Sequence, residues 1–251
     1  MRKIILILLA VALLQFQSTA QMKDSVVHHA PGKSIFKINL SALIVKNYSF
    51  QYELAIGRKT SVALGYRFMS NSNLPFKESI KNSISDPDTK KQVDNFTTSN
   101  SAFTPEIRFY LGKKGVFHGF YLAPFARISQ YKANMPNFKY TVGSTEETIS
   151  LSGKLNTTTG GLLLGAQWSL GKSIYLDWWI LGPNGGGSNG FIEGKQALNS
   201  TEQDAFRKAL QDLSIPFTHT NATVDANGGR LDMKGSWAGF RSGGLCLGIR
   251  F

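Results

Sequence analysis

The chain has 251 residues and carries 28 Lys or Arg against 16 Asp or Glu, a formal net charge of +12. Its single cysteine, Cys246, excludes an internal disulfide, and its length suits one large β domain or two small domains. After the first twenty residues no apolar run is long enough to form a membrane-spanning helix, which excludes a helical membrane protein.

Residues 1–20 have the pattern of a secretory signal peptide. Two basic residues precede the apolar run 4–14, which is shorter than the about 20 residues that cross a bilayer as a helix. Small residues up to Ala20 then form a cleavage site. We therefore expect an exported mature chain, with a periplasmic leader at 21–33 and one folded domain at 34–251.

Apolar and polar residues alternate with a period of two through most of the mature chain, which predicts β-strands. Residues 60–69 are an example, because Val62, Leu64 and Tyr66 alternate with Ser61 and Gly65. Segments of about ten residues with this repeat are the signature of a transmembrane β-barrel. The pattern occurs in eight stretches, at residues 34–45, 48–57, 60–69, 103–111, 120–129, 162–170, 174–180 and about 237–251.

Short and long connections between these stretches alternate. The connections 57–60, 112–119 and 171–173 are tight and basic. The intervening ones are the two-residue connection 46–47 and the long segments 70–102, 132–156 and 182–236. An antiparallel up-and-down barrel predicts this order, with short periplasmic turns at one rim and long extracellular loops at the other. The glycine-rich segment 182–190 is expected to be the flexible base of the last loop.

Basic residues gather in the tight turns, where we expect them to contact anionic lipid headgroups. The long loops hold twelve basic and twelve acidic residues and are therefore neutral as a set. No basic and aromatic platform of the kind that binds nucleic acid is evident, so we expect no nucleic-acid partner. The turn residues are Arg58, Lys59, Lys113, Lys114 and Lys172.

Charged residues also occupy the polar face of the strands, and a barrel would direct them into its lumen. Eight strands leave an interior just wide enough for side chains, so we expect an ion-paired plug rather than an open pore. An ion-conducting path is the alternative. Arg241 has the opposite parity and is expected to face outward, near lipopolysaccharide. The predicted lumen residues are Lys37, Glu53, Arg67, Glu106, Arg108, Arg127, Asp177 and Arg250.

The chain ends on an alternating apolar strand, with Leu245, Leu247, Ile249 and Phe251 on one face. This end resembles the C-terminal signal that the barrel-insertion machinery reads in Gram-negative outer-membrane proteins. Residues 39–68 are also similar to the first hairpins of small eight-stranded barrels of the OmpA, OmpX and OmpW type. The resemblance implies an outer-membrane location and a monomeric barrel.

The last long loop contains an expected amphipathic helix at 200–214. Ser200 can cap it and Gln203 can complete a capping box. No cofactor, metal or catalytic constellation is predicted. Thr218, His219 and Asp225 are the residues of a less favoured alternative, a lipid-modifying enzyme.

The sequence therefore favours an all-β, eight-stranded transmembrane barrel with a structural or surface-interaction role through its extracellular loops. Its expected partners are outer-membrane lipid and lipopolysaccharide, the insertion machinery and an unidentified surface ligand. The other hypotheses are a narrow conduit for small hydrophobic solutes and a soluble lipocalin-like barrel, which would have an apolar interior.

Overall fold

The computed structural model describes residues 32–213 and 218–251. The expected signal peptide and nearly all of the expected leader lie outside the described residues. The strands are β1 (Ser34–Asn39), β2 (Tyr48–Ala55), β3 (Thr60–Asn73), β4 (Thr97–Tyr110), β5 (Gly119–Val142), β6 (Thr145–Ser169), β7 (Ile174–Leu181), β8 (Pro183–Lys195), β9 (Thr218–Asp225), β10 (Gly228–Phe240) and β11 (Gly244–Arg250). The helices are α2 (Leu40–Ile44), α3 (Lys77–Asn82), α4 (Pro87–Asn95) and α5 (Ser200–Gln211).

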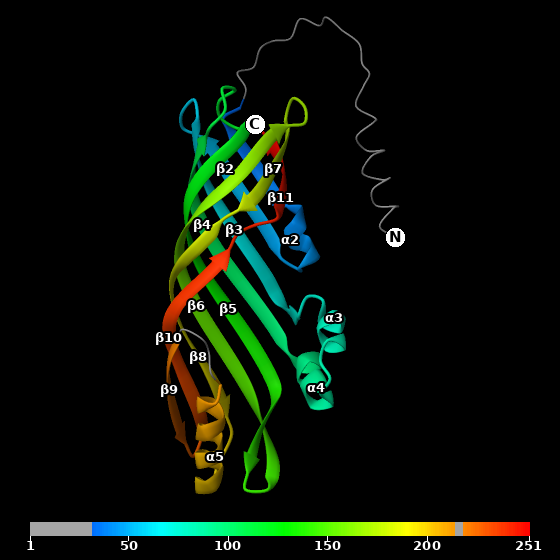
Figure 1. Cartoon of the computed structure of the whole chain (residues 1–251), viewed down its shortest axis with the longest axis vertical. Coiled ribbons are helices and arrows are strands. Elements are labelled where there is room, and N and C mark those ends of the chain that lie inside the picture. The colour runs from blue at the N-terminus through cyan, green and yellow to red at the C-terminus, as the bar shows by residue number, and fades with distance from the viewer. Residues whose placement is uncertain (1–31, 214–217) are drawn as a thin grey trace, which may run out of the picture. The chain divides into compact units, whose positions relative to one another are not determined.

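Eight antiparallel strands close into a ring in the order β1-β2-β3-β4-β5-β6-β7-β11. The last strand pairs with the first, with Asn39 opposite Cys246. Ser34 and Phe251 exchange two backbone hydrogen bonds, of 3.1 and 3.0 Å. The tight turns lie at the end of the ring where the C-terminus is drawn in Figure 1. We call this the short-turn end. The predicted eight-stranded antiparallel barrel is confirmed.

The wall of the ring is inside out relative to a soluble protein. Its charged side chains are buried, whereas large apolar side chains such as Leu64, Ile107 and Leu162 are exposed on the outer surface. The exposed set includes aromatic residues from several strands, among them Phe109, Phe120, Trp168 and Trp178. An exposed apolar belt around a charged interior is the pattern of a transmembrane barrel and excludes the lipocalin-like alternative.

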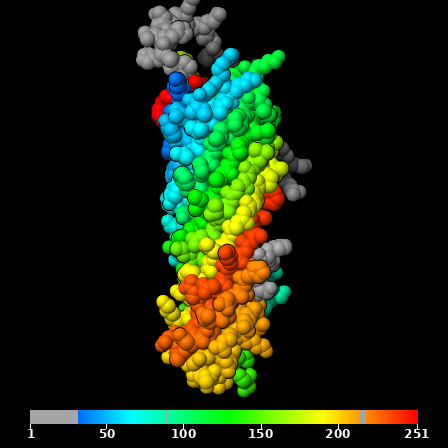
Figure 2. All heavy atoms as spheres, turned by 90° about the vertical axis from the view of Figure 1, so that its left-hand side faces the viewer, coloured from blue at the N-terminus to red at the C-terminus, as the bar shows by residue number. Residues whose placement is uncertain are grey.

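The sheet continues beyond the ring at the other end. β7 and β8 form one long strand interrupted at Gly182, and β10 and β11 form another interrupted at 241–243. On the side of these breaks that is away from the short-turn end, the pairing order becomes β5-β6-β8-β10-β9. In Figure 2 the strands cross one face as oblique neighbouring bands that run from green through yellow to orange. We call the part formed by β8, β9, β10, α5 and the outer halves of β5 and β6 the extension.

The extension corrects the prediction that 132–156 and 182–236 are loops. Most of these residues are strands, and β5 and β6 pair as far as Val142 and Thr145, with one register shift between Met135 and Phe138. The extension has a second apolar core, against which α5 packs with Phe206 and Leu210 fully buried. The other buried members of this core are Tyr140, Ile149, Leu151, Leu198, Leu231 and Met233.

The N-terminus of α5 differs in detail from the prediction. Asn199, rather than Ser200, is the N-cap, and its side chain accepts a hydrogen bond from the Glu202 backbone N–H at 3.0 Å. Glu202, rather than Gln203, completes the capping box by accepting from the Asn199 N–H at 2.7 Å. An Asn cap has the same chemistry as a Ser cap, so the motif was placed one residue late.

The first predicted strand is also shorter than expected. β1 ends at Asn39, whose side chain caps α2 by accepting from the Ala42 backbone N–H at 3.1 Å. The loop predicted at 70–102 likewise contains α3 and α4. There the Lys81 and Lys77 ammonium groups hydrogen-bond to Asp94 and hold the pKa of its carboxyl below the usual value.

Candidate functional site

A network of charged side chains crosses the lumen of the ring. It is built from inward positions on separate strands, so that residues far apart in sequence meet in one layer. Lys37 comes from β1, Glu53 from β2, Glu106 and Arg108 from β4, and Asp177 from β7. All five are at most 3 % exposed. We call these residues, with Arg241, the charged plug.

Lys37 and Arg108 share two carboxylates. The Lys37 Nζ lies 2.6 Å from an Asp177 oxygen and also pairs with Glu53. The Arg108 Nη1 lies 2.7 Å from the same Asp177 oxygen and 3.1 Å from Glu53. Both cations also donate to the Gln167 side-chain oxygen, at 3.0 and 3.2 Å. Each buried charge therefore has more than one partner, which is the condition for tolerating it away from water.

Glu106 joins Arg108 to Arg241. Its carboxylate accepts from Arg108 Nε at 2.6 Å and from the Gln51 amide at 3.0 Å, and its other oxygen pairs with Arg241. The predicted outward direction of Arg241 is therefore wrong, because Arg241 is only 6 % exposed and points inward. Alternation shifts between β10 and β11, where Gly243 adopts a φ of +67°, so parity counted back from the C-terminus fails beyond this point.

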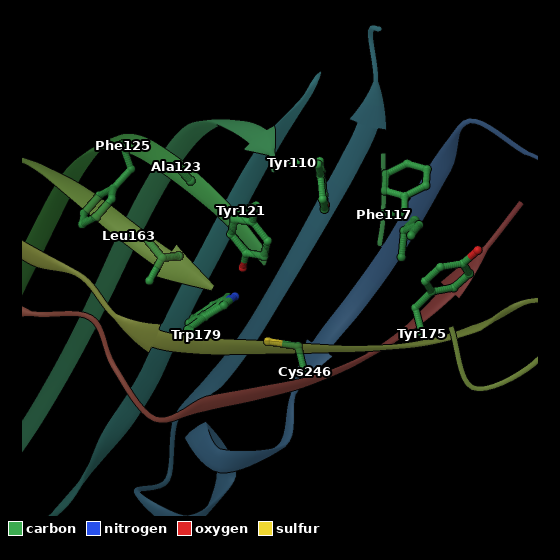
Figure 3. Close-up of a cluster of buried hydrophobic side chains, with 10 residues drawn as sticks. Tyr110, Phe117, Tyr121, Ala123, Phe125, Leu163, Tyr175, Trp179 and Cys246 are labelled. Carbon is green, nitrogen blue, oxygen red and sulfur yellow. The ribbon is translucent and has the colours of Figure 1, made fainter. Parts of the chain in front are cut away.

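Aromatic side chains fill the remaining space on the short-turn side of the charged plug. The Tyr110 hydroxyl donates to Glu53 at 2.6 Å, and the Tyr121 hydroxyl donates to Asp177 at 2.7 Å. Phe117, from the turn between β4 and β5, is fully buried and packs edge-on against Tyr110 and Tyr175. Figure 3 shows these rings gathered inside the ring of strands. The lumen is thus occupied by packed side chains at this level.

A cavity of about 500 Å³ lies in the lumen on the other side of the charged plug. Residues of all eight ring strands line it, together with residues of α2, β8 and β10. Arg67, Arg127 and Arg241 are the charged residues in its lining, which contains no Asp or Glu among the residues that the structure describes. Arg241 therefore belongs to both the charged plug and the cavity.

The structure divides the eight predicted lumen residues into three groups. Five belong to the charged plug, and Arg67 and Arg127 line the cavity. Arg250 lies apart, half-buried at the short-turn end, where it donates to the Gly32 carbonyl at 2.6 Å and to the Tyr175 hydroxyl at 2.8 Å. Gln51, Gln167 and Arg241 are network members that the prediction missed, and uncharged inward polar residues on the same strands were the available signal for the two glutamines.

The remaining predicted residues occupy the surface. The basic turn residues Arg58, Lys59, Lys113, Lys114 and Lys172 are exposed at the short-turn end. On β11, Leu245, Ile249 and the terminal Phe251 are exposed on the outer side, and Leu247 is partly exposed.

The residues of the enzyme alternative do not converge. Thr218 and His219 begin β9, opposite Gly235 and Lys234, whereas Asp225 ends the same strand. Six residues along an extended strand place His219 and Asp225 about 20 Å apart. No group of three or more potential metal ligands is found in the described ranges. None of the helices in these ranges is long and apolar enough to cross a membrane.

Three solved structures resemble the chain weakly. The attachment invasion locus protein Ail of Yersinia pestis has 11 % identity and a TM-score of 0.33, over 88 % of this chain and 99 % of that one. A major outer membrane protein of Thermus thermophilus has 13 % identity and a TM-score of 0.37, over 89 % and 100 %. CarO of Acinetobacter baumannii has 11 % identity and a TM-score of 0.34, over 82 % and 98 %. At these scores the barrel assignment rests on the strand pairing of this chain alone.

The comparison with curated proteins gives no match. A family profile, in contrast, matches residues 5–182. This segment is more than half of the 251 residues and includes β1 to β7, which carry all of the charged plug except Arg241. The chain therefore belongs to the family described as Protein of unknown function (DUF3575).

Proposed function

We propose that the protein is a non-conducting outer-membrane barrel that presents the extension at the cell surface for contact with a partner. The observation that carries this proposal is the independent apolar core of the extension, in which Phe206, Leu210 and Leu231 are at most 1 % exposed. A segment whose only task is to connect strands needs no core of its own. A core fixes the outer strands in one conformation, as a recognition surface requires.

The filled lumen supports the non-conducting part of this proposal. Lys37, Arg108, Phe117 and Tyr121 are at most 1 % exposed, and together they occupy the space that hydrated ions would need at this level. We expect no conductance above background when the purified protein is added to planar bilayers. Stable single-channel steps from the wild type would contradict this part of the proposal.

The position of the extension can be tested with single cysteines. Ser144 lies exposed in the turn between β5 and β6, and Lys113 lies exposed at the short-turn end. A membrane-impermeant maleimide added to intact cells should label Ser144→Cys and leave Lys113→Cys unlabelled. The native Cys246 is buried and contributes little background. Labelling of Lys113→Cys alone would place the extension in the periplasm and overturn the proposal.

The surface role can be separated from a purely structural one by shortening the β5–β6 hairpin. Met135 and Leu151 are paired partners, so an Asn-Gly turn in place of residues 136–150 can join them directly. This change removes Tyr140 and Ile149 from the core of the extension and leaves the ring intact. If the extension contacts a partner, cells that carry the variant lose attachment to surfaces, while the barrel still shows its heat-modifiable band. Unchanged attachment with a leakier envelope would instead support a structural role.

A second function, transport of small hydrophobic solutes, is favoured by one observation. Phe240 of β10, which lines the cavity, is exposed, and so are Leu43 and Ile44 of α2, the helix that contributes Ala42 to the lining. Passage onward through the lumen would have to cross the charged plug. Uptake of a labelled hydrophobic solute that depends on the protein and rises when Phe117 is replaced by Ala would support this function.

A further inference from the structure

The lumen contains more positive than negative charge. Its buried and half-buried cations are Lys37, Arg67, Arg108, Arg127 and Arg241, and its carboxylates are Glu53, Glu106 and Asp177, which leaves a surplus of two positive charges. Each of these carboxylates is engaged by Lys37, Arg108 or Arg241 in the charged plug. The surplus therefore resides on Arg67 and Arg127.

These two guanidinium groups have no acidic partner among the residues that the structure describes. The Arg67 Nε is buried without a hydrogen bond, and the Arg127 Nε donates to the Ser129 hydroxyl at 3.3 Å. Tyr131 lies close enough to interact with both. A phenol supplies a hydrogen bond but no negative charge, so the positive charge of these two half-buried guanidinium groups stays uncompensated within the protein.

Residues that line the cavity also carry other buried polar atoms without protein partners. Seven such side-chain atoms occur in the described part of the chain, and four belong to residues that line the cavity. They are Asn47 Oδ1, Arg67 Nε, Thr159 Oγ1 and Trp179 Nε1. Three of the four can donate a hydrogen bond. Water in the cavity cannot neutralise the two guanidinium charges, so an anion fits the cavity better than water does.

An opening in the wall connects the cavity with the outside. β9 pairs with β10 only as far as Gly235, so residues 236–240 have β8 on one side and no strand on the other among the described residues. Across the opening, β1 gives way to α2 after Asn39. Residues from both borders, Ala42 and Phe240 among them, line the cavity.

We propose that the cavity binds the phosphate group of an anionic ligand, held by Arg67, Arg127 and Arg241. Planar guanidinium groups bind phosphate oxygens in a bidentate manner, and three of them around one cavity match a tetrahedral anion. A cavity of about 500 Å³ exceeds the volume of a phosphate group alone and leaves room for the rest of a small ligand or a lipid headgroup. The rings of Tyr131 and Trp237, tilted by 31° with centroids 5.8 Å apart, line the same cavity. This site is independent of the proposed surface role.

The test compares the wild type with Arg67→Gln/Arg127→Gln, which removes both surplus charges. The control, Lys195→Gln/Lys208→Gln, makes the same charge change at exposed positions of the extension. The thermal unfolding midpoint of each protein is measured in neutral detergent with increasing inorganic phosphate, at an ionic strength kept constant with chloride. A second series uses nanodiscs of phosphatidylcholine with increasing phosphatidylglycerol. A ligand that binds only the folded state raises the midpoint.

In the first outcome, the midpoint of the wild type and of the control rises saturably with phosphate, while the double variant needs at least tenfold more phosphate for the same rise. This result supports a site for soluble phosphorylated ligands. A response only to phosphatidylglycerol, again lost in the double variant, supports a site for a lipid headgroup. No response in either series, or the same response in all three proteins, overturns the proposal.

The thermal unfolding midpoint without phosphate provides a further check, and a second variant provides an alternative to the double variant. In chloride buffer the double variant should unfold at a midpoint no lower than the wild type, because it loses unpaired charges. A clearly lower midpoint would mean that the two arginines have partners within the protein, and would count against the proposal. If the double variant does not insert, Gly65→Val serves instead. A Cβ at Gly65 meets only ordinary contacts of 3.5 Å or more, so the added side chain fills the cavity without moving the charges.

Discussion

Replacing Glu106 with Ala should destabilise the barrel more than any surface carboxylate replacement. Glu106 is 3 % exposed and joins Arg108, Gln51 and Arg241. Arg108 would keep Asp177 at 2.7 Å and Glu53 at 3.1 Å, so its charge would remain balanced. Arg241 would lose its carboxylate and keep its stacking on Trp179, at 3.9 Å from the ring centre.

The size of the destabilisation follows from the loss of the only carboxylate that pairs with Arg241 among the described residues. Breaking a buried ion pair by removing one partner costs about 3–5 kcal/mol, and we take the lower end because Arg241 also lines the cavity, where water can reach its freed guanidinium. We therefore expect Glu106→Ala to lower the free energy of unfolding by about 3 kcal/mol. Removing Arg241 as well should restore part of the loss, with a coupling of about 1–3 kcal/mol in the double-mutant cycle.

Urea-induced unfolding in lipid vesicles, monitored by tryptophan fluorescence and by the heat-modifiable gel shift, measures these differences. Glu146→Ala is the matched control, because Glu146 pairs with Lys139 at an exposed position and should change stability by at most about 1 kcal/mol. If Glu106→Ala and Glu146→Ala give equal free energies of unfolding, the inward ion pairing described above is wrong.

Three further predictions concern the extension, the closure of the ring and its thiol. Phe206→Ala removes a fully buried ring whose centroid lies 5.3 Å from that of Tyr140. Limited proteolysis should therefore cut the extension of this variant while the gel shift of the barrel persists. Protease resistance equal to that of the wild type would contradict the independent core. Deleting Phe251 removes both backbone hydrogen bonds with Ser34, so the yield of heat-modifiable barrel should fall, and undiminished assembly would show that this closure is dispensable. Cys246 is 1 % exposed, so a water-soluble maleimide should label it only after denaturation, and rapid labelling of the folded protein would refute its inward position.

The period-two pattern was sufficient to predict the ring because one face of each strand meets an apolar surrounding and the other a polar interior. Lys37, Glu53, Glu106 and Asp177 could be assigned to the lumen from parity alone. Their partners could not be assigned, because pairing across the lumen depends on how the strands are staggered. Gln51 and Gln167 complete the network through such contacts, and neither carries a charge that would have marked it.

The extension was not predicted because its strands show that pattern only in short stretches, such as 138–142 and 149–151, between polar and glycine-rich residues. Residues 182–190 suggested a flexible loop, yet β8 is paired on both sides, by β6 and β10. At Gly186 and Gly190 an added Cβ would lie 2.1 and 2.3 Å from backbone oxygens of β6, so the glycines permit a close approach of two strands. Glycine is ambiguous in a single sequence because the same residue permits both flexibility and tight backbone contact.

The paired breaks at Gly182 and Arg241 separate two parts of the sheet that can change independently. The two positions are joined by a hydrogen bond of 2.8 Å from the Arg241 N–H to the Gly182 carbonyl. The alternation of inward and outward side chains therefore shifts at the same level in both long strands. On the short-turn side of these breaks, closure of the ring fixes the number of strands. On the other side, β9 and α5 are added without changing any strand pair of the ring. The segment 183–240, between the two breaks, can therefore be replaced as a unit in evolution or in design. The outer part then varies while the ring keeps its strand stagger and its circumference.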